Sequence, residues 1–126
     1  MSKFDVMKEK FSTIYKLYVQ KAERKQRTKQ EVDTIILWLT DYKPDELEVM
    51  LNSEATLEEF LNNMPAMNSK AGLIKGKVCG IRVEDIQDPL TKKMRYLDKL
   101  IDELAKGYAI VSPFVNTVFY KSSVDF

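Results

Sequence analysis

Four helix start signals, spread across most of the chain, constrain its fold more than any other feature of the sequence. Residues 28–31 and 56–59 each place threonine three positions before glutamate. This is the spacing of a capping box, in which each side chain accepts a hydrogen bond from the other residue's backbone amide. Pro44 and Pro89 stand where helices can begin, because proline suits the first helical position. The sequence therefore predicts several helices with well-defined beginnings.

Apolar side chains follow these signals at the three- and four-residue spacing of an amphipathic helix. The predicted helices cover about Phe4–Lys25, 28–40, 44–51, 56–64 and 89–106. The second of them is apolar on more than one side, because Leu37 and Trp38 project away from its main stripe. A helix of this kind lies at the centre of a fold or faces a partner. Leu37 and Trp38 are therefore candidate interface residues.

The length of the chain, 126 residues, is typical of one domain. Such a chain can bury roughly two-thirds of its unfolded surface. We expect an all-α fold, with a single helical domain over residues 1–107. Residues 108–126 form an apolar tail that we expect to pack on the domain or on a partner. Ser112 and Pro113 could begin a short helix there, a strand is nearly as well supported, and Phe114 and Phe119 are candidate interface residues in either conformation.

Residues 68–88 are ambiguous between helix and strand. Gly72, Gly76 and Gly80 recur every four residues and would share one face of a helix, where they would let another backbone approach closely. The β-branched residues of 78–83 favour a strand instead. Helix is the favoured interpretation because no second convincing strand is visible, and one short strand or hairpin around 76–84 is the alternative.

The chain has no histidine and only one cysteine, Cys79. This content excludes Ser-His and Cys-His nucleophile pairs and the common zinc sites, so we expect no cofactor and no metal, and an enzyme is the less favoured class. We expect Cys79 to be a small buried hydrophobic residue. The chain has no partner for a disulfide, no apolar run of about 20 residues and no apolar N-terminal segment. We expect a cytoplasmic protein that does not bind membranes.

Charge is unevenly distributed along the chain. Residues 1–30 hold nine Lys and Arg against three Asp and Glu, whereas residues 31–66 hold one against nine. This asymmetry is compatible with a homo-oligomer of complementary surfaces, with a polyanion site, or with two solvated faces. The net charge is only +1, and a strongly basic domain would be expected for DNA, so nucleic acid is a less favoured partner.

Two stretches of the chain are long and unusual in sequence: YVQKAERKQRTKQEVDTIILWLTDY (18–42) and VCGIRVEDIQDPLTKKMRYLDKLIDELAKG (78–107). Both resemble an uncharacterised bacterial family, domain of unknown function 2200. The resemblance covers most of residues 11–107 and does not extend into the tail. It implies a small bundle of about five to six helices at steep crossing angles. It implies no activity and no catalytic residues.

Two groups of charged residues are candidate ligand contacts. Arg24, Arg27 and Thr28 belong to a basic run whose cations could neutralise phosphates, beside a helix start whose free amides favour anions. Arg82 and Glu84 lie outside the clear helices and could contact a small ligand. A solvated surface or structural ion pairing is the favoured explanation of both groups. In the last helix Arg95, Lys99, Asp102 and Lys106 lie opposite the leucine stripe, where we expect them to face water.

The favoured function is a non-catalytic helical interaction module that self-associates. The alternative is a small-molecule or anion-binding protein, with or without enzyme activity, whose site lies near residues 76–88. A second alternative is weak nucleic-acid binding through the basic run 21–29.

Overall fold

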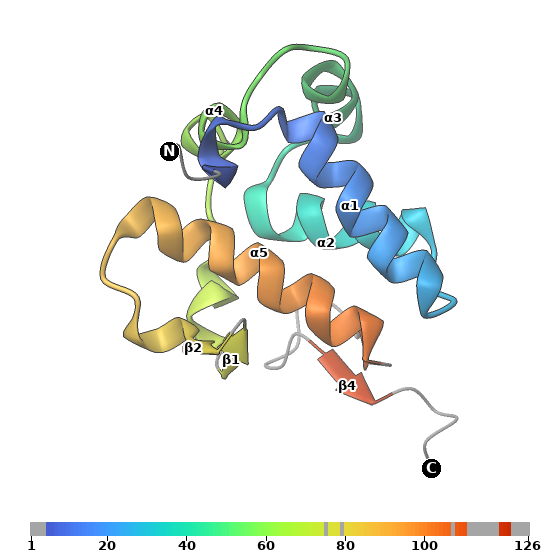
Figure 1. The fold of residues 1–126 in the computed structure, drawn as a ribbon, viewed down its shortest axis with the longest axis vertical. Coiled ribbons are helices and arrows are strands. Elements are labelled where there is room, and N and C mark those ends of the chain that lie inside the picture. The colour runs from blue at the N-terminus through green and yellow to red at the C-terminus, as the bar shows by residue number, and fades with distance from the viewer. Residues whose placement is uncertain (1–4, 75, 79, 107, 111–118, 122–126) are drawn as a thin grey trace.

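The computed structural model describes residues 5–74, 76–78, 80–106, 108–110 and 119–121. Within these residues five α-helices form the domain: α1 (Phe11–Arg24), α2 (Lys29–Thr40), α3 (Pro44–Leu51), α4 (Leu57–Asn62) and α5 (Pro89–Ala105). Three short 3-10 helices accompany them: η1 (Val6–Lys8), η2 (Ser69–Leu73) and η3 (Val83–Asp85). The predicted all-α fold is confirmed. In Figure 1, α5 crosses the middle of the molecule, with α3 and α4 above it and the strands below it.

The predicted helix starts are formed as expected. At the start of α2, the Thr28 amide donates to Glu31 Oε1 over 2.9 Å and the Glu31 amide donates to Thr28 Oγ1 over 3.1 Å. The same reciprocal pair opens α4 at residues 56–59. Asp88 Oδ2 accepts from the Thr91 amide at the start of α5. These short-range bonds stabilise helix ends whose first amides have no partner within the helix.

The first helix begins later than predicted, at Phe11 instead of Phe4. The Phe11 amide donates to the carbonyl of Ala55, and the Leu57 amide donates to the carbonyl of Glu9. This pairing holds the chain before α1 against the start of α4, so residues 9 and 10 are extended. It also brings together the rings of Phe11 and Phe60, which stack with their centroids 3.7 Å apart.

The core is a single cluster in which the leucine stripe of α5 meets α1, α2 and α4. Tyr42 closes one end of it: its ring stacks on Phe60 and its hydroxyl donates to the Phe60 carbonyl over 2.7 Å. The largest side chains with almost no exposed surface are Phe11, Phe60, Ile35, Ile36, Leu39, Leu57, Leu61, Leu97, Leu100, Ile101, Leu104 and Val32. Burial of such side chains contributes about 1.5–3 kcal/mol each, which makes this cluster the main source of stability.

The favoured helix over residues 76–84 is wrong, and the alternative hairpin is present. Strand β1 (Lys77–Val78) pairs antiparallel with β2 (Ile81–Arg82), so the partner strand that the sequence did not reveal lies three residues away. Gly76 and Gly80 have φ of +106° and +80°, values that a right-handed helix excludes. The predicted close approach of a second backbone is also wrong at Gly80, because nothing lies within 4 Å of the position of an added Cβ.

The described part of the tail forms a second antiparallel pair of strands. Strand β3 (Tyr108–Ile110) pairs antiparallel with β4 (Phe119–Lys121), and β3 contacts α5. The strand interpretation therefore holds for these six residues. The predicted helix after Ser112 and Pro113 lies mostly outside the described residues. Its last member, Phe119, is the first residue of β4.

No helix in the described part of the chain is long and apolar enough to cross a bilayer.

Candidate functional site

Trp38 borders a hollow of about 340 Å³ at the C-terminal end of α2. The opposite wall is the segment 66–70, which runs past the end of the helix. The hollow is lined by Trp38, Asp41, Ala66, Met67, Asn68, Ser69 and Lys70. Trp38 and Met67 are both half-buried and pack against the core, so each leaves part of its apolar surface toward solvent.

Backbone hydrogen bonds hold the two walls together. The last carbonyls of a helix have no partner inside it. Here the Ala66 amide donates to the Thr40 carbonyl over 3.3 Å, and the Asn68 amide donates to the Leu39 carbonyl over 3.0 Å. The Asn68 side-chain amide donates to the Trp38 carbonyl over 3.1 Å. These three hydrogen bonds anchor the segment 66–70 to the end of α2.

The chemistry of the hollow suits an apolar group with a polar rim. Trp38 and Met67 offer a large aromatic and a polarisable surface, while Asp41 and Lys70 add one charge of each sign. Asp41 ends α2 in the left-handed conformation, with φ of +62°. Among the described residues no group of three or more Asp, Glu, Cys or His side chains is placed to hold a metal ion.

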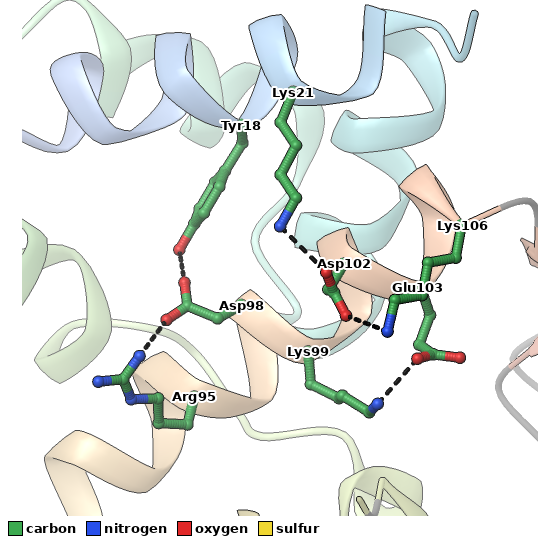
Figure 2. A network of polar contacts seen from close by, with 8 residues as sticks. All are labelled: Tyr18, Lys21, Arg95, Asp98, Lys99, Asp102, Glu103 and Lys106. Atoms are coloured by element: carbon green, nitrogen blue, oxygen red, sulfur yellow. Dashed lines mark hydrogen bonds and ion pairs between the residues drawn. The ribbon is translucent and has the colours of Figure 1, made fainter. Parts of the chain in front are cut away.

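A part-buried polar network joins α1 to α5 (Figure 2). Tyr18 donates a hydrogen bond to Asp98 Oδ1, and Lys21 contacts Asp102 Oδ1 at 3.2 Å. Arg95 contacts Asp98 Oδ2 from within α5. Arg95 Nε is buried and has no hydrogen-bond partner among the described residues.

The prediction that the charged face of α5 is solvated is wrong for the residues beneath α1 and the β1–β2 hairpin. The Lys99 side chain is only 11% exposed and the Asp102 side chain only 21%. Gly76 lies over Lys99, because a Cβ added to the glycine would be 3.3 Å from Lys99 Nζ. Lys99 Nζ pairs with Glu103 Oε2 at 2.8 Å, and this ion pair compensates the buried ammonium group.

Burial and neighbouring charges move the two aspartates of this network in opposite directions. Desolvation raises the pKa of Asp98 above its ordinary value of 3.8 and outweighs the hydrogen bond from Tyr18 and the charge of Arg95. Burial also acts to raise the pKa of Asp102, but hydrogen bonds from Lys106 and Lys21 outweigh it and lower that pKa overall. The protonation of these two aspartates therefore depends on how α1 packs on α5. The contacts of the network connect the two helices.

Comparison with known proteins places the chain in a family. A family model described as an uncharacterised protein conserved in bacteria, DUF2200, matches residues 5–112. The chain belongs to the DUF2200 family. The resemblance seen in residues 18–42 and 78–107 is thereby confirmed. The family match includes β3 and so extends past the helical domain.

One solved structure resembles this DUF2200 protein over most of its length. It is the crystal structure of uncharacterized protein SP1917, with a TM-score of 0.81 and 36% sequence identity. The match covers 86% of this chain and 88% of that chain. A comparison with curated proteins finds no match.

The basic run of this DUF2200 chain makes several contacts within the domain. Arg27 Nε donates to the Leu104 carbonyl over 3.2 Å, so it caps the C-terminal end of α5. Thr28 is engaged in the capping box of α2. Arg24 is exposed and its Nε lies 3.4 Å from the carbonyl of Gln20 in its own helix. The three candidates are neighbours in sequence, but Arg27 and Thr28 point into protein contacts.

The second pair of candidates belongs to the hairpin. Glu84 Oε1 accepts from the Gly76 amide over 3.0 Å, and the Val83 amide donates to the Gly76 carbonyl. These bonds close the base of the hairpin. Arg82 is exposed on β2, opposite Lys77. Arg82 and Glu84 are therefore close in the fold, and Glu84 has a structural contact of its own.

The remaining candidates separate in the structure. Leu37 packs against the core and does not line the Trp38 hollow, although the sequence places both residues away from the main stripe of α2. Phe114 and Cys79 lie outside the described residues. Phe119 is described only by its backbone, as part of β4. Sequence reasoning missed Met67 and Lys70, because nothing local indicates that residues 66–70 return to the end of α2.

Proposed function

We propose that this protein is a non-catalytic helical interaction module that self-associates through the surface around Trp38. The observation that carries the proposal is the hollow in which half-buried Trp38 meets Met67. Tryptophan and methionine are enriched in interfaces, and an aromatic anchor binds strongly when the partner excludes water from its pocket.

A second copy of the chain is the occupant that the surroundings favour. Leu73 is 49% exposed, and it ends the short helix η2 that begins at Ser69 in the wall of the hollow. In a two-fold contact the same patch meets itself, so Leu73 of one copy can approach the Trp38 hollow of the other. Asp41 and Lys70 lie in the same hollow, which lets opposite charges pair across the contact.

Light scattering over a wide range of protein concentration tests this proposal. We expect a dimer that dissociates on dilution, and we expect the emission of Trp38, the only tryptophan, to shift to the red as the dimer dissociates. Leu73→Asp should abolish association. Ile81→Asp is the matched control, because Ile81 is 46% exposed but lies on the β1–β2 hairpin. A protein that stays monomeric at every concentration, with unchanged emission, contradicts self-association.

The alternative sites draw less support from their contacts. Arg27 in the basic run and Glu84 near the hairpin already bond to the domain. Each of these bonds would have to break, or be shared, before the side chain could hold a ligand. The Trp38 hollow needs no such rearrangement.

A further inference from the structure

The surface formed by α1, α2 and α3 carries two hollows that meet at Lys29 and Leu51. The first has a volume of about 270 Å³ and is lined by Ser12, Tyr15, Lys16, Val19, Lys29 and Leu51. The second, of about 360 Å³, continues from Lys29 and Leu51 toward Asp33 and Glu48. We call the two together the α1–α3 cleft.

The floor of the first hollow is apolar. Val19 and Leu51 are half-buried hydrophobic side chains that pack against the core, and Tyr15, which also lines the hollow, is a core residue with 8% exposure. Because Val19 comes from α1 and Leu51 from the end of α3, the floor exists only in the folded domain. An aliphatic chain lying on it would remove apolar surface from water.

Lys29 is held in position over this floor. Its Nζ lies 3.0 Å from Asp33 Oδ2 and 5.8 Å from the centre of the Tyr15 ring. Asp33 Oδ1 accepts a 2.6 Å hydrogen bond from the Tyr15 hydroxyl, so one carboxylate orients both neighbours. The ammonium group is thus placed at the boundary between the apolar and the polar hollow.

Lys16 supplies a second positive charge to the lining of the first hollow. It is exposed, and no hydrogen bond or ion pair joins it to any other residue in the described part of the chain. The first hollow contains these two lysines and no acidic side chain. The acids Asp33 and Glu48 line only the second hollow. The electrostatic field that these charges create along the cleft therefore favours a negative group near Lys16 and disfavours one near Glu48.

We propose that the α1–α3 cleft binds a small aliphatic carboxylate, with its chain on Tyr15, Val19 and Leu51 and its carboxylate between Lys16 and Lys29. The volume of the first hollow is just below the usual range of roughly 300–1,000 Å³ for ligand pockets, which restricts the ligand to a short chain or a single branched group. This inference is independent of self-association through Trp38, because the two surfaces share no lining residue.

Titration calorimetry with octanoate and with N-acetyl-leucine tests the proposal. The two probes separate a straight chain from an amino-acid-like group, and binding of either supports the site. Octylammonium carries a similar chain with a positive charge, and octan-1-ol carries one with no charge. We expect both to bind at least about tenfold more weakly than the better carboxylate, because the lysines repel a cation and give a neutral group no charge attraction. Equal binding of octan-1-ol and the better carboxylate overturns the proposal, and so does the absence of heat with both carboxylates.

A matched pair of variants locates the site. Lys16→Glu places a negative charge at the edge of the first hollow, and we expect it to weaken binding of the better carboxylate about tenfold. Lys77→Glu makes the same change on the exposed hairpin and should leave the affinity unchanged. Lys16 is exposed and forms no hydrogen bond or ion pair with the described residues, so we expect the variant to stay folded, and the melting temperature of each variant checks this. Equal affinity of the two variants overturns the assignment to this cleft.

Discussion

The Tyr18 hydroxyl donates a 2.5 Å hydrogen bond to Asp98 Oδ1, joining α1 to α5 across 80 positions of sequence. Around this bond, the Asp98 side chain is only 21% exposed and its other oxygen contacts Arg95. A buried carboxylate that loses a hydrogen-bond donor keeps its desolvation penalty without compensation. The pairing of these two residues therefore stabilises the contact between the first and last helices.

Replacing Tyr18 by phenylalanine removes this donor and keeps the ring. We expect Tyr18→Phe to lower the free energy of unfolding by about 1–3 kcal/mol in urea titrations at neutral pH. Tyr96→Phe is the control: Tyr96 is also buried, but its hydroxyl forms no hydrogen bond with the described residues, so the change should be small. Equal effects of the two substitutions would contradict a specific role of the Tyr18–Asp98 bond.

The raised pKa of Asp98 predicts a particular dependence of stability on pH. Because desolvation raises this pKa above 3.8 in the folded state, protonated Asp98 is favoured by folding. The stability that protonated Asp98 contributes is fully present below the pKa of the unfolded state. It is lost as pH rises through the pKa of the folded state. Asp98→Asn has no such titration, so the stability of the variant relative to wild type should increase over that pH interval. Urea titrations at a series of pH values check this, and a constant difference across the interval would refute it.

Local signals predicted the helices well because their causes are local. The capping boxes at 28–31 and 56–59 and the proline at Pro44 need only a few neighbouring residues to act. The burial of Lys99 could not be predicted in the same way, because it depends on the hairpin that packs over α5. Helical periodicity assigns a charged face to α5 but does not say that other elements cover it. The Trp38 hollow is likewise formed by segments that no sequence pattern connects.

Gly80 allows the turn of the β1–β2 hairpin by its backbone conformation. Its φ is +80°, and nothing lies within 4 Å of an added Cβ, so Gly80→Ala should destabilise through strain and not through a clash. We expect a loss of about 1 kcal/mol, measured as a lower melting temperature. Gly80→Asn should lose less, because asparagine tolerates positive φ. Gly72→Ala, also in open space but without positive φ, should be neutral or stabilising. A larger loss of melting temperature from Gly72→Ala than from Gly80→Ala would refute the interpretation.

Arg27 distinguishes a structural role of the basic run from an anion-binding role. Its Nε bonds to the Leu104 carbonyl near the end of α5, and a side chain with 19% exposure has little freedom to reach a solvent anion. A cation at a helix C-terminus also interacts favourably with the helix dipole. We expect Arg27→Gln to lower the free energy of unfolding by about 1 kcal/mol. Arg24→Gln, on the exposed end of α1, should have no measurable effect on stability.

If the basic run instead binds nucleic acid, both substitutions will weaken binding to a duplex in low salt and will reduce the salt dependence of that binding by a similar amount. Denaturant titration and binding at two salt concentrations on the same pair of variants therefore separate the roles: a loss of stability confined to Arg27→Gln, without duplex binding by the wild type, supports the structural cap.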